Sequence, residues 1–145
     1  MLSDYYFSHP IRVRYSEIDG QKIVFNAHYS TYIDVAVTEY FRTVISPDWM
    51  QLAEENVFDL VVRKMTLEFL SPAKLDDMLQ VHCRVKKIGT SSMTFEYVIT
   101  RDEEVLVQAE SIQVCFDSTA GKAKAIPKEV VDKISSFEGT ALSVK

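Results

Sequence analysis

The chain has 145 residues, which suits one well-buried core and is too short for two ordinary domains. Hydrophobic residues make up 47% of it and charged residues 26%, which argues against a disordered, collagen-like or disulfide-stapled chain. The formal net charge of -5 opposes nucleic-acid binding, because phosphate neutralisation needs a concentrated excess of lysine and arginine. We expect a single domain spanning residues 1–145, with its core at about residues 10–133 and a loose tail from Ser135.

Two features indicate a cytoplasmic protein that does not enter a membrane. No apolar run approaches the ~20 residues of a membrane span, and the first ten residues contain Asp4 and no apolar stretch typical of a secretory signal. Cys83 and Cys115 lie in apolar, strand-like runs without C-x-x-C spacing. We therefore expect reduced thiols and a cytoplasmic setting.

The N-terminal part of the chain predicts a strand followed by a long helix. Ile11, Val13 and Tyr15 alternate with polar residues, as in a strand that ends at the Asp19-Gly20 turn. A three-four spacing of apolar residues then predicts a helix of about four to five turns, with Asn26 as its N-cap and an end at Ser46-Pro47. The apolar face of this helix comprises Tyr29, Tyr32, Ile33, Ala36, Tyr40 and Val44, flanked by Val37 and Phe41.

The rest of the chain reads mainly as strands. A short helix is expected at residues 47–55, and alternating apolar residues then predict strands at 61–69, 79–85, 93–99 and 105–116. In the last strand the apolar phase shifts between Val107 and Ile112, which suggests a β-bulge. A final helix is expected to begin near Pro127. The order predicts an α+β fold in which an antiparallel sheet of about five strands wraps around one long central helix.

Residues 15–32 combine groups that are useful for acyl chemistry. Asp19 places a carboxylate on a tight turn, and a helix begins near Asn26 after a short loop. A helix start carries unpaired N–H groups that can stabilise an oxyanion, and a nearby carboxylate can attack a carbonyl or deprotonate water. Taken alone, these residues favour an ordinary Asp-Gly turn and a helix cap over a catalytic role, because both residue types are common at such positions.

The pattern nevertheless resembles a known family. Asp19 followed by the run at residues 24–29 is similar to the hallmark of the 4-hydroxybenzoyl-CoA thioesterase-like branch of hotdog-fold acyl-CoA thioesterases. The likeness continues through residues 69–79, 88–92 and 121–127 in the same order and spacing. It departs at Lys22, where many members carry glycine, and at the 89–91 hairpin tip, where some members carry arginines.

The resemblance implies an acyl-CoA thioesterase with a hotdog fold. Asp19 would act as nucleophile or general base, and the backbone N–H of Asn26, with that of Ala27, would stabilise the oxyanion. Tyr29 and Tyr32 would shape the acyl pocket. The phosphate end of coenzyme A would meet backbone N–H groups together with Lys74, Lys86, Lys87, Ser91 and Ser92.

The resemblance also implies a homodimer or homotetramer that needs no cofactor. His9, His28 and His82 lack the spacing of a metal site, so we expect no metal. Two alternatives stay open: a thioesterase acting on acyl carrier protein, and a non-catalytic acyl-CoA binding protein whose loop is misaligned by Lys22. If Asp19 proves to be only a turn residue, Glu17 is the next candidate for the catalytic carboxylate.

Overall fold

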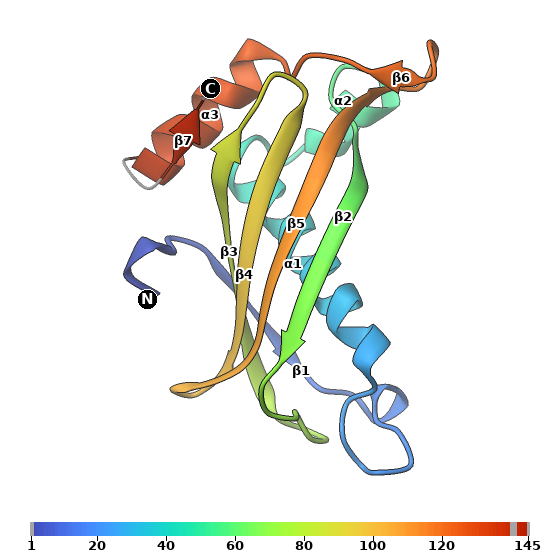
Figure 1. The fold of residues 1–145 in the computed structure, drawn as a ribbon, viewed down its shortest axis with the longest axis vertical. Coiled ribbons are helices and arrows are strands. Elements are labelled where there is room, and N and C mark those ends of the chain that lie inside the picture. The colour runs from blue at the N-terminus through green and yellow to red at the C-terminus, as the bar shows by residue number, and fades with distance from the viewer. Residues whose placement is uncertain (1, 140–141, 145) are drawn as a thin grey trace.

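A computed structural model describes residues 2–139 and 142–144 (Figure 1). In chain order the elements are η1 (Leu2–Asp4), β1 (Ser8–Arg12), η2 (Tyr15–Glu17), α1 (Asn26–Val44), α2 (Trp49–Glu54), β2 (Leu60–Phe69), β3 (Met78–Ile88), β4 (Ser92–Arg101), β5 (Glu104–Asp117), β6 (Lys122–Ala123), α3 (Lys128–Glu138) and β7 (Ser143–Val144).

The sheet has the strand order β1-β3-β4-β5-β2, and each neighbouring pair in this order is antiparallel. Two short strands extend it, because β6 pairs with β5 and β7 runs parallel to β3. Helix α1 crosses one face of the sheet, and the opposite face is turned toward the viewer in Figure 1. This arrangement confirms the predicted α+β class, the predicted helix and the antiparallel hotdog sheet.

Helix α1 forms the centre of the core. Its predicted apolar face is buried, with Tyr32, Ala36 and Tyr40 at most 1% exposed, while Val44 is only partly buried. Burial of each large apolar side chain contributes ~1.5–3 kcal/mol relative to exposure. The opposite side of the helix, which includes Thr31 and Val35, is exposed. No helix in the described residues is long and apolar enough to cross a membrane.

The predicted first strand is wrong in its C-terminal half. Strand β1 ends at Arg12, and Tyr15 lies in the turn η2, where the residue is 79% exposed. The cause is Glu17, whose Oε1 accepts a hydrogen bond from the Arg14 backbone N–H at 2.8 Å and so closes the turn. The chain therefore leaves the sheet before Tyr15 is reached.

Two further predictions need correction near α1 and β5. Asn26 is the first residue of α1 rather than its N-cap, and Phe25 holds the cap position without a side-chain hydrogen bond. The extra residue of β5 is Leu106, because Ile99 pairs with Val107 while the next residue of β4 pairs with Val105. The change in apolar alternation between Val107 and Ile112, which suggested a bulge there, has a different cause.

Polar side chains occupy the inner face of β5 after Val107. Ser111 and Gln113 are buried there, while Ile112 on the other face is only partly buried. The Ser111 Oγ lies 2.7 Å from the Tyr97 hydroxyl, so the buried polar atoms satisfy each other. The apparent shift in sequence therefore reflects an internal polar pair and not a bulge between Val107 and Ile112.

The predicted loose tail is also wrong over residues 135–138, which form the end of α3. Ile134 is fully buried, and Glu138 is 0% exposed against the Tyr40 hydroxyl. Strand β7 then pairs with the end of β3. The remaining tail positions, 140, 141 and 145, lie outside the described residues.

Candidate active site

The carboxylate predicted to be catalytic lies on a closed turn. The carbonyl oxygen of Asp19 accepts the Lys22 N–H at 2.9 Å, and its Oδ1 accepts the Gln21 N–H at 2.8 Å. Lys22 adopts a φ of 66°, a left-handed conformation that glycine adopts without strain. This backbone conformation explains why glycine is suited to the position where the chain carries Lys22. The turn nevertheless closes with lysine present.

Main-chain hydrogen bonds attach this turn to the region before α1. Ile18 forms an antiparallel bridge with Val24, and the Asp19 N–H donates to the Ile23 carbonyl at 2.9 Å. The Val24 N–H then donates to the Ala73 carbonyl at 2.9 Å. The Asp19 turn, the start of α1 and the turn before β3 thus form one hydrogen-bonded unit at the lower end of Figure 1.

The start of α1 offers the electrophilic groups of the site. Asn26 is the first helical residue, so its N–H has no carbonyl one turn earlier in the helix to bind. Phe25 supplies no side-chain cap for the first turn, although the His28 N–H donates to the Phe25 carbonyl at 2.9 Å. The dipole of the 19-residue helix adds positive partial charge at this end. Such a position can stabilise an oxyanion.

A cavity of about 210 Å³ lies beside the helix start. Its walls come from the loop before α1, the first turn of α1 and the end of β2. The lining residues are Ile23, Val24, Asn26, Tyr29, Phe69, Leu70, Ser71 and Pro72. This lining is mostly apolar, and Asn26 brings the helix start into it. Asp19 is not part of the wall but lies on the turn that is bonded to Ile23.

The two predicted pocket tyrosines have different surroundings. Tyr29 lines the cavity, and its hydroxyl oxygen accepts the Ala73 N–H at 3.1 Å. Tyr32 does not line it and instead donates its hydroxyl to Glu17 Oε1 at 2.8 Å. Burial raises the pKa of both hydroxyls, and for Tyr32 the hydrogen bond to Glu17 raises it further. Tyr29 therefore belongs to the cavity wall, whereas Tyr32 lies outside the cavity and contacts the segment before α1 through Glu17.

Glu17 is a site residue that periodicity in the sequence does not reveal. Its side chain is 3% exposed and receives hydrogen bonds from Arg14 and Tyr32. Burial on its own would raise the pKa of Glu17, but the hydrogen bonds from Arg14 and Tyr32 together outweigh burial and lower the pKa below its ordinary value. Glu17 is therefore held as a buried, ionised carboxylate.

Arg101 also lies beside the site, and unlike Glu17 it is not singled out by the sequence. Its guanidinium contacts Asp77 Oδ2 at 2.6 Å and the Pro72 carbonyl at 3.3 Å. Burial acts to raise the pKa of Asp77, but Arg101 and the Lys74 N–H together lower it. This ion pair fixes the turn that supplies Pro72 to the cavity and Ala73 to Tyr29.

The residues predicted to bind the phosphate end of coenzyme A fall into two groups. Lys74 lies in the turn next to the site, where it forms an antiparallel bridge with Ile23. The others belong to the β3–β4 hairpin, whose tip is at the opposite end of the sheet (Figure 1). They are Lys86, Lys87, Ser91 and Ser92. A single copy of the chain does not bring this second group to Asp19.

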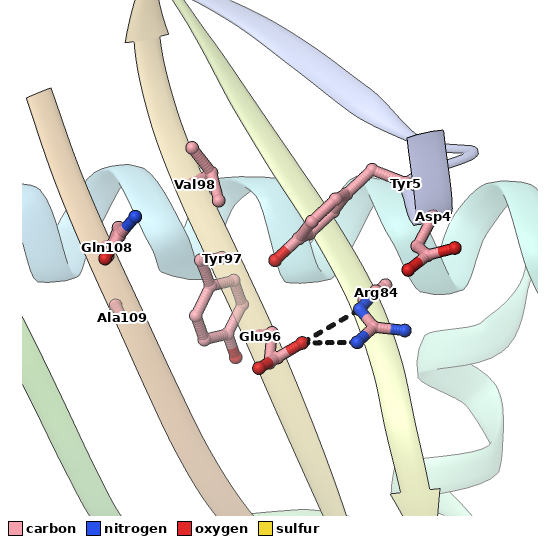
Figure 2. A pocket seen from close by; sticks show the side chains of 8 residues that line it. All are labelled: Asp4, Tyr5, Arg84, Glu96, Tyr97, Val98, Gln108 and Ala109. Carbon is pink, nitrogen blue, oxygen red and sulfur yellow. Dashed lines mark hydrogen bonds and ion pairs between the residues drawn. The ribbon is translucent and has the colours of Figure 1, made fainter. Parts of the chain in front are cut away.

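Lys86 belongs to a network of ion pairs on the outer face of the sheet. Its Nζ lies 2.7 Å from Glu110 and 3.3 Å from Glu96. Glu96 also binds Arg84 at 2.6 Å beside a hollow of about 300 Å³, where Tyr5 lies over the guanidinium (Figure 2). Burial raises the pKa of Tyr5 to about 12. The network braces the N-terminal segment against the face that lies away from α1.

The histidines, cysteines and acidic residues of the described part of the chain are arranged as follows. No group of three or more His, Cys, Asp or Glu side chains there is arranged to hold a metal ion. Cys83 and Cys115 are buried, and burial raises the pKa of each thiol. Both therefore favour the protonated state and fit strand packing better than nucleophilic catalysis.

The sequence is similar to known thioesterases. The family model of the thioesterase superfamily matches residues 21–108. An acyl-CoA thioester hydrolase, YbgC of Escherichia coli O6:H1, is 35% identical over 126 residues, covering 86% of this chain and 92% of that protein. The long-chain acyl-CoA thioesterase FadM of Escherichia coli K12 is 28% identical, covering 88% of this chain and 96% of that protein.

Solved structures share the fold. A thioesterase from Thermus thermophilus, crystallised with coenzyme A and Zn, superposes with a TM-score of 0.82 at 27% identity, covering 94% of this chain and 97% of that one. A hypothetical protein from Aquifex aeolicus gives the same TM-score at 25% identity, covering 88% and 98% of the two chains. The matched family model spans more than half of this sequence. The chain belongs to the thioesterase superfamily.

Proposed function

We propose that this chain hydrolyses acyl-CoA thioesters at the Asp19 turn and the start of α1. The observation that carries the proposal is structural: one hydrogen-bonded unit joins a turn bearing a carboxylate to a helix start that opens into an apolar cavity. The relatives named as acyl-CoA thioesterases support coenzyme A as the carrier of the acyl group.

The thioester carbonyl would lie with its oxygen at the Asn26 N–H. As a nucleophile, the Asp19 carboxylate attacks the carbonyl carbon and expels the CoA thiolate, which takes a proton from water; water then hydrolyses the mixed anhydride. As a general base, Asp19 instead takes a proton from water while that water attacks the carbonyl carbon. The tetrahedral intermediate then collapses, the CoA thiolate leaves, and it takes up the proton held by Asp19. In both routes negative charge develops on the oxygen beside the helix start, where the N–H and the dipole stabilise it.

The cavity fits the acyl part of such a substrate. Tyr29, Phe69 and Leu70 give it aromatic and aliphatic walls. An apolar acyl group would be buried there, which contributes binding free energy in proportion to its buried area. Phe69 and Leu70 are about half exposed, at 47% and 51%, so a bound ligand would cover apolar surface that is now open.

We further propose that the active form is at least a homodimer. Strand β2 is at the edge of the sheet, and Val61 and Val62 on it are 43% and 55% exposed. Antiparallel pairing of two β2 strands would place the hairpin of one copy at the Asp19 end of the other. The lysines and serines of that hairpin would then approach the nucleotide end of the ligand. Light scattering at micromolar concentration should give at least a dimer, and a monomer would contradict this arrangement.

The function is tested by measuring thiol release from a panel of acyl-CoA thioesters of different acyl length, both aliphatic and aromatic. We expect turnover of at least one member. Matched acyl groups on acyl carrier protein form the second arm, and faster turnover of those would make carrier protein the substrate. Binding of acyl-CoA without thiol release from either carrier would identify a non-catalytic binding protein and contradict the proposal.

A further inference from the structure

Glu17 connects the two halves of the proposed active site. Its carboxylate receives four hydrogen bonds: Oε1 accepts the Arg14 N–H at 2.8 Å and the Tyr32 hydroxyl at 2.8 Å, and Oε2 accepts Arg14 Nε–H at 2.7 Å and an Nη2–H of the same guanidinium. A buried carboxylate with this many donors is fixed in position. Tyr32 belongs to α1, so the side chain of Glu17 ties the turn η2 to the central helix.

The main chain of Glu17 makes the complementary link. Its carbonyl accepts the N–H of Phe25 at 2.9 Å, and Phe25 immediately precedes Asn26. Asp19 follows Glu17 by two residues. The positions of the carboxylate and of the proposed oxyanion donor are therefore both set relative to Glu17. Loss of the Tyr32 hydroxyl would remove the side-chain link between the loop and the helix, leaving only main-chain hydrogen bonds, without removing any group from the cavity wall.

We propose that Glu17 is a positioning residue, which acts with Tyr32 to hold Asp19 and the Asn26 N–H in register for thioester hydrolysis. The inference rests on the proposed function. Glu17 does not line the cavity, and both its oxygens are occupied by donors. This geometry leaves no oxygen for a substrate or an attacking water. Glu17 therefore acts through Asp19 and not as a base itself.

The chain offers a matched control at the other half of α1. Tyr40 is also buried, and its hydroxyl also donates to a buried glutamate, Glu138. Glu138 belongs to α3 and receives the Val85 N–H from β3, so this second pair contacts neither the Asp19 turn nor the cavity. Tyr40→Phe thus removes a hydroxyl of the same kind from the same helix, away from the chemistry.

The experiment compares the parent, Tyr32→Phe, Tyr40→Phe and Glu17→Gln. We expect Tyr32→Phe to lower kcat by about tenfold with KM within about twofold, since small displacements of reacting groups are costly while substrate contacts remain. Tyr40→Phe should lower the thermal midpoint but leave kcat close to that of the parent. Glu17→Gln, which cannot serve all four donors, should reduce kcat at least as much as Tyr32→Phe. An equal kcat in Tyr32→Phe and the parent would overturn the proposal.

Two further readouts separate positioning from general destabilisation. In an Asp19→Asn background, Tyr32→Phe should cost little additional activity, because the group that it positions is already disabled. Amide hydrogen exchange at Lys22, Val24 and Phe25 should become faster in Tyr32→Phe but not in Tyr40→Phe, with or without substrate. Unchanged exchange would contradict the inference even in an active enzyme, whereas a parent that hydrolyses no thioester would contradict the proposed function alone.

Discussion

Helix α1 contacts a buried glutamate near each of its ends, and the two contacts differ in charge balance. Near the N-terminal end, Tyr32 binds Glu17, whose carboxylate also pairs with Arg14. Toward the C-terminal end, Tyr40 binds Glu138, whose other oxygen has no hydrogen-bond partner among the described residues. The hydrogen bonds from Arg14 and Tyr32 outweigh burial and lower the pKa of Glu17, whereas burial dominates at Glu138 and raises its pKa.

The difference shows how one kind of contact serves two purposes. At the Glu17 end, the paired charge fixes a loop that stays near solvent beside a cavity. At the Glu138 end, the carboxyl group receives hydrogen bonds on only one of its two oxygens among the described residues. This contact attaches helix α3 to the core. The first arrangement suits a site where groups must be held but accessible. The second suits a permanent contact between α3 and the core, and protonation of Glu138 would reduce the free-energy cost of burying its carboxyl group.

The largest expected effect is the fall in kcat on removal of the N–H donor at the start of α1, the end of the helix that Glu17 contacts. Asn26→Pro removes that N–H, and proline is well tolerated at the first helical position, after a residue with an extended ψ of 137°. We expect kcat to fall about 100- to 1000-fold, the usual cost of losing an oxyanion donor. Asn26→Ala keeps the N–H and should stay within a few-fold of the parent. Equal rates for the two variants would remove the helix start from the mechanism.

A smaller effect, confined to stability, is expected at the opposite end. Glu138→Ala leaves the Val85 N–H and the Tyr40 hydroxyl buried without their acceptor, and should cost about 2–4 kcal/mol in urea unfolding. Glu138→Gln keeps an acceptor oxygen for both donors and removes the charge, so it should be at least as stable as the parent at neutral pH. If Glu138→Gln is as damaging as Glu138→Ala, the carboxylate charge is needed there.

The contributions of Glu17 and Glu138 to folding stability should depend on pH in opposite directions. Because the folded-state pKa of Glu138 is raised, its contribution is full below the ordinary value of 4.5 and is lost as pH rises through the raised pKa. Because the pKa of Glu17 is lowered, its contribution is present above 4.5 and is lost as pH falls through the lowered pKa. The stability advantage of Glu138→Gln over the parent should therefore grow from acidic to neutral pH. A constant difference would show that Glu138 does not titrate in that range.

The smallest effect is expected from the backbone conformation of Lys22, next to Asp19 in its turn. Lys22→Gly relieves a left-handed φ of 66° that costs a side chain about 1 kcal/mol, although glycine also gains entropy in the unfolded chain. We expect a net gain of up to about 1 kcal/mol in the free energy of unfolding, with kcat within about twofold. Gln21→Gly, at a neighbour that has no positive φ, should instead destabilise the chain. A large change in kcat for Lys22→Gly would mean that the lysine itself shapes the site.

The parts of the structure that follow periodicity could be predicted from the sequence. The buried face of α1 and the strands β2 to β5 depend on local alternation of apolar residues, and they appear where expected. The polar contacts could not be predicted in this way. Glu17 and Tyr32 are 15 positions apart, and Tyr40 and Glu138 are 98 apart, so no local pattern joins them. The end of α3 depends on the Tyr40–Glu138 contact, which is why the predicted loose tail was wrong. The first strand ends at the local hydrogen bond between Arg14 and Glu17, which the alternation of apolar residues does not register.

The candidate site was predictable to a similar extent. The Asp19 turn and the helix start are adjacent in sequence and lie together in the fold. The hairpin lysines were selected by charge and resemblance, but the direction of β3 carries them to the far end of the sheet. The resemblance implied that Tyr32 lines the pocket with Tyr29, and only the path of the preceding loop shows that Tyr32 contacts Glu17.

The most direct test of the account is the kcat of Asp19→Asn on the best acyl-CoA thioester. Asparagine keeps the oxygen that accepts the Gln21 N–H, so the turn should still form, while nucleophilic and basic functions are lost. Asp76→Asn, in an exposed turn with a φ of 70°, is the matched control. We predict a fall in kcat of about 100-fold or more for Asp19→Asn, with KM within a few-fold and Asp76→Asn close to the parent. A kcat for Asp19→Asn within a few-fold of the parent would contradict the account.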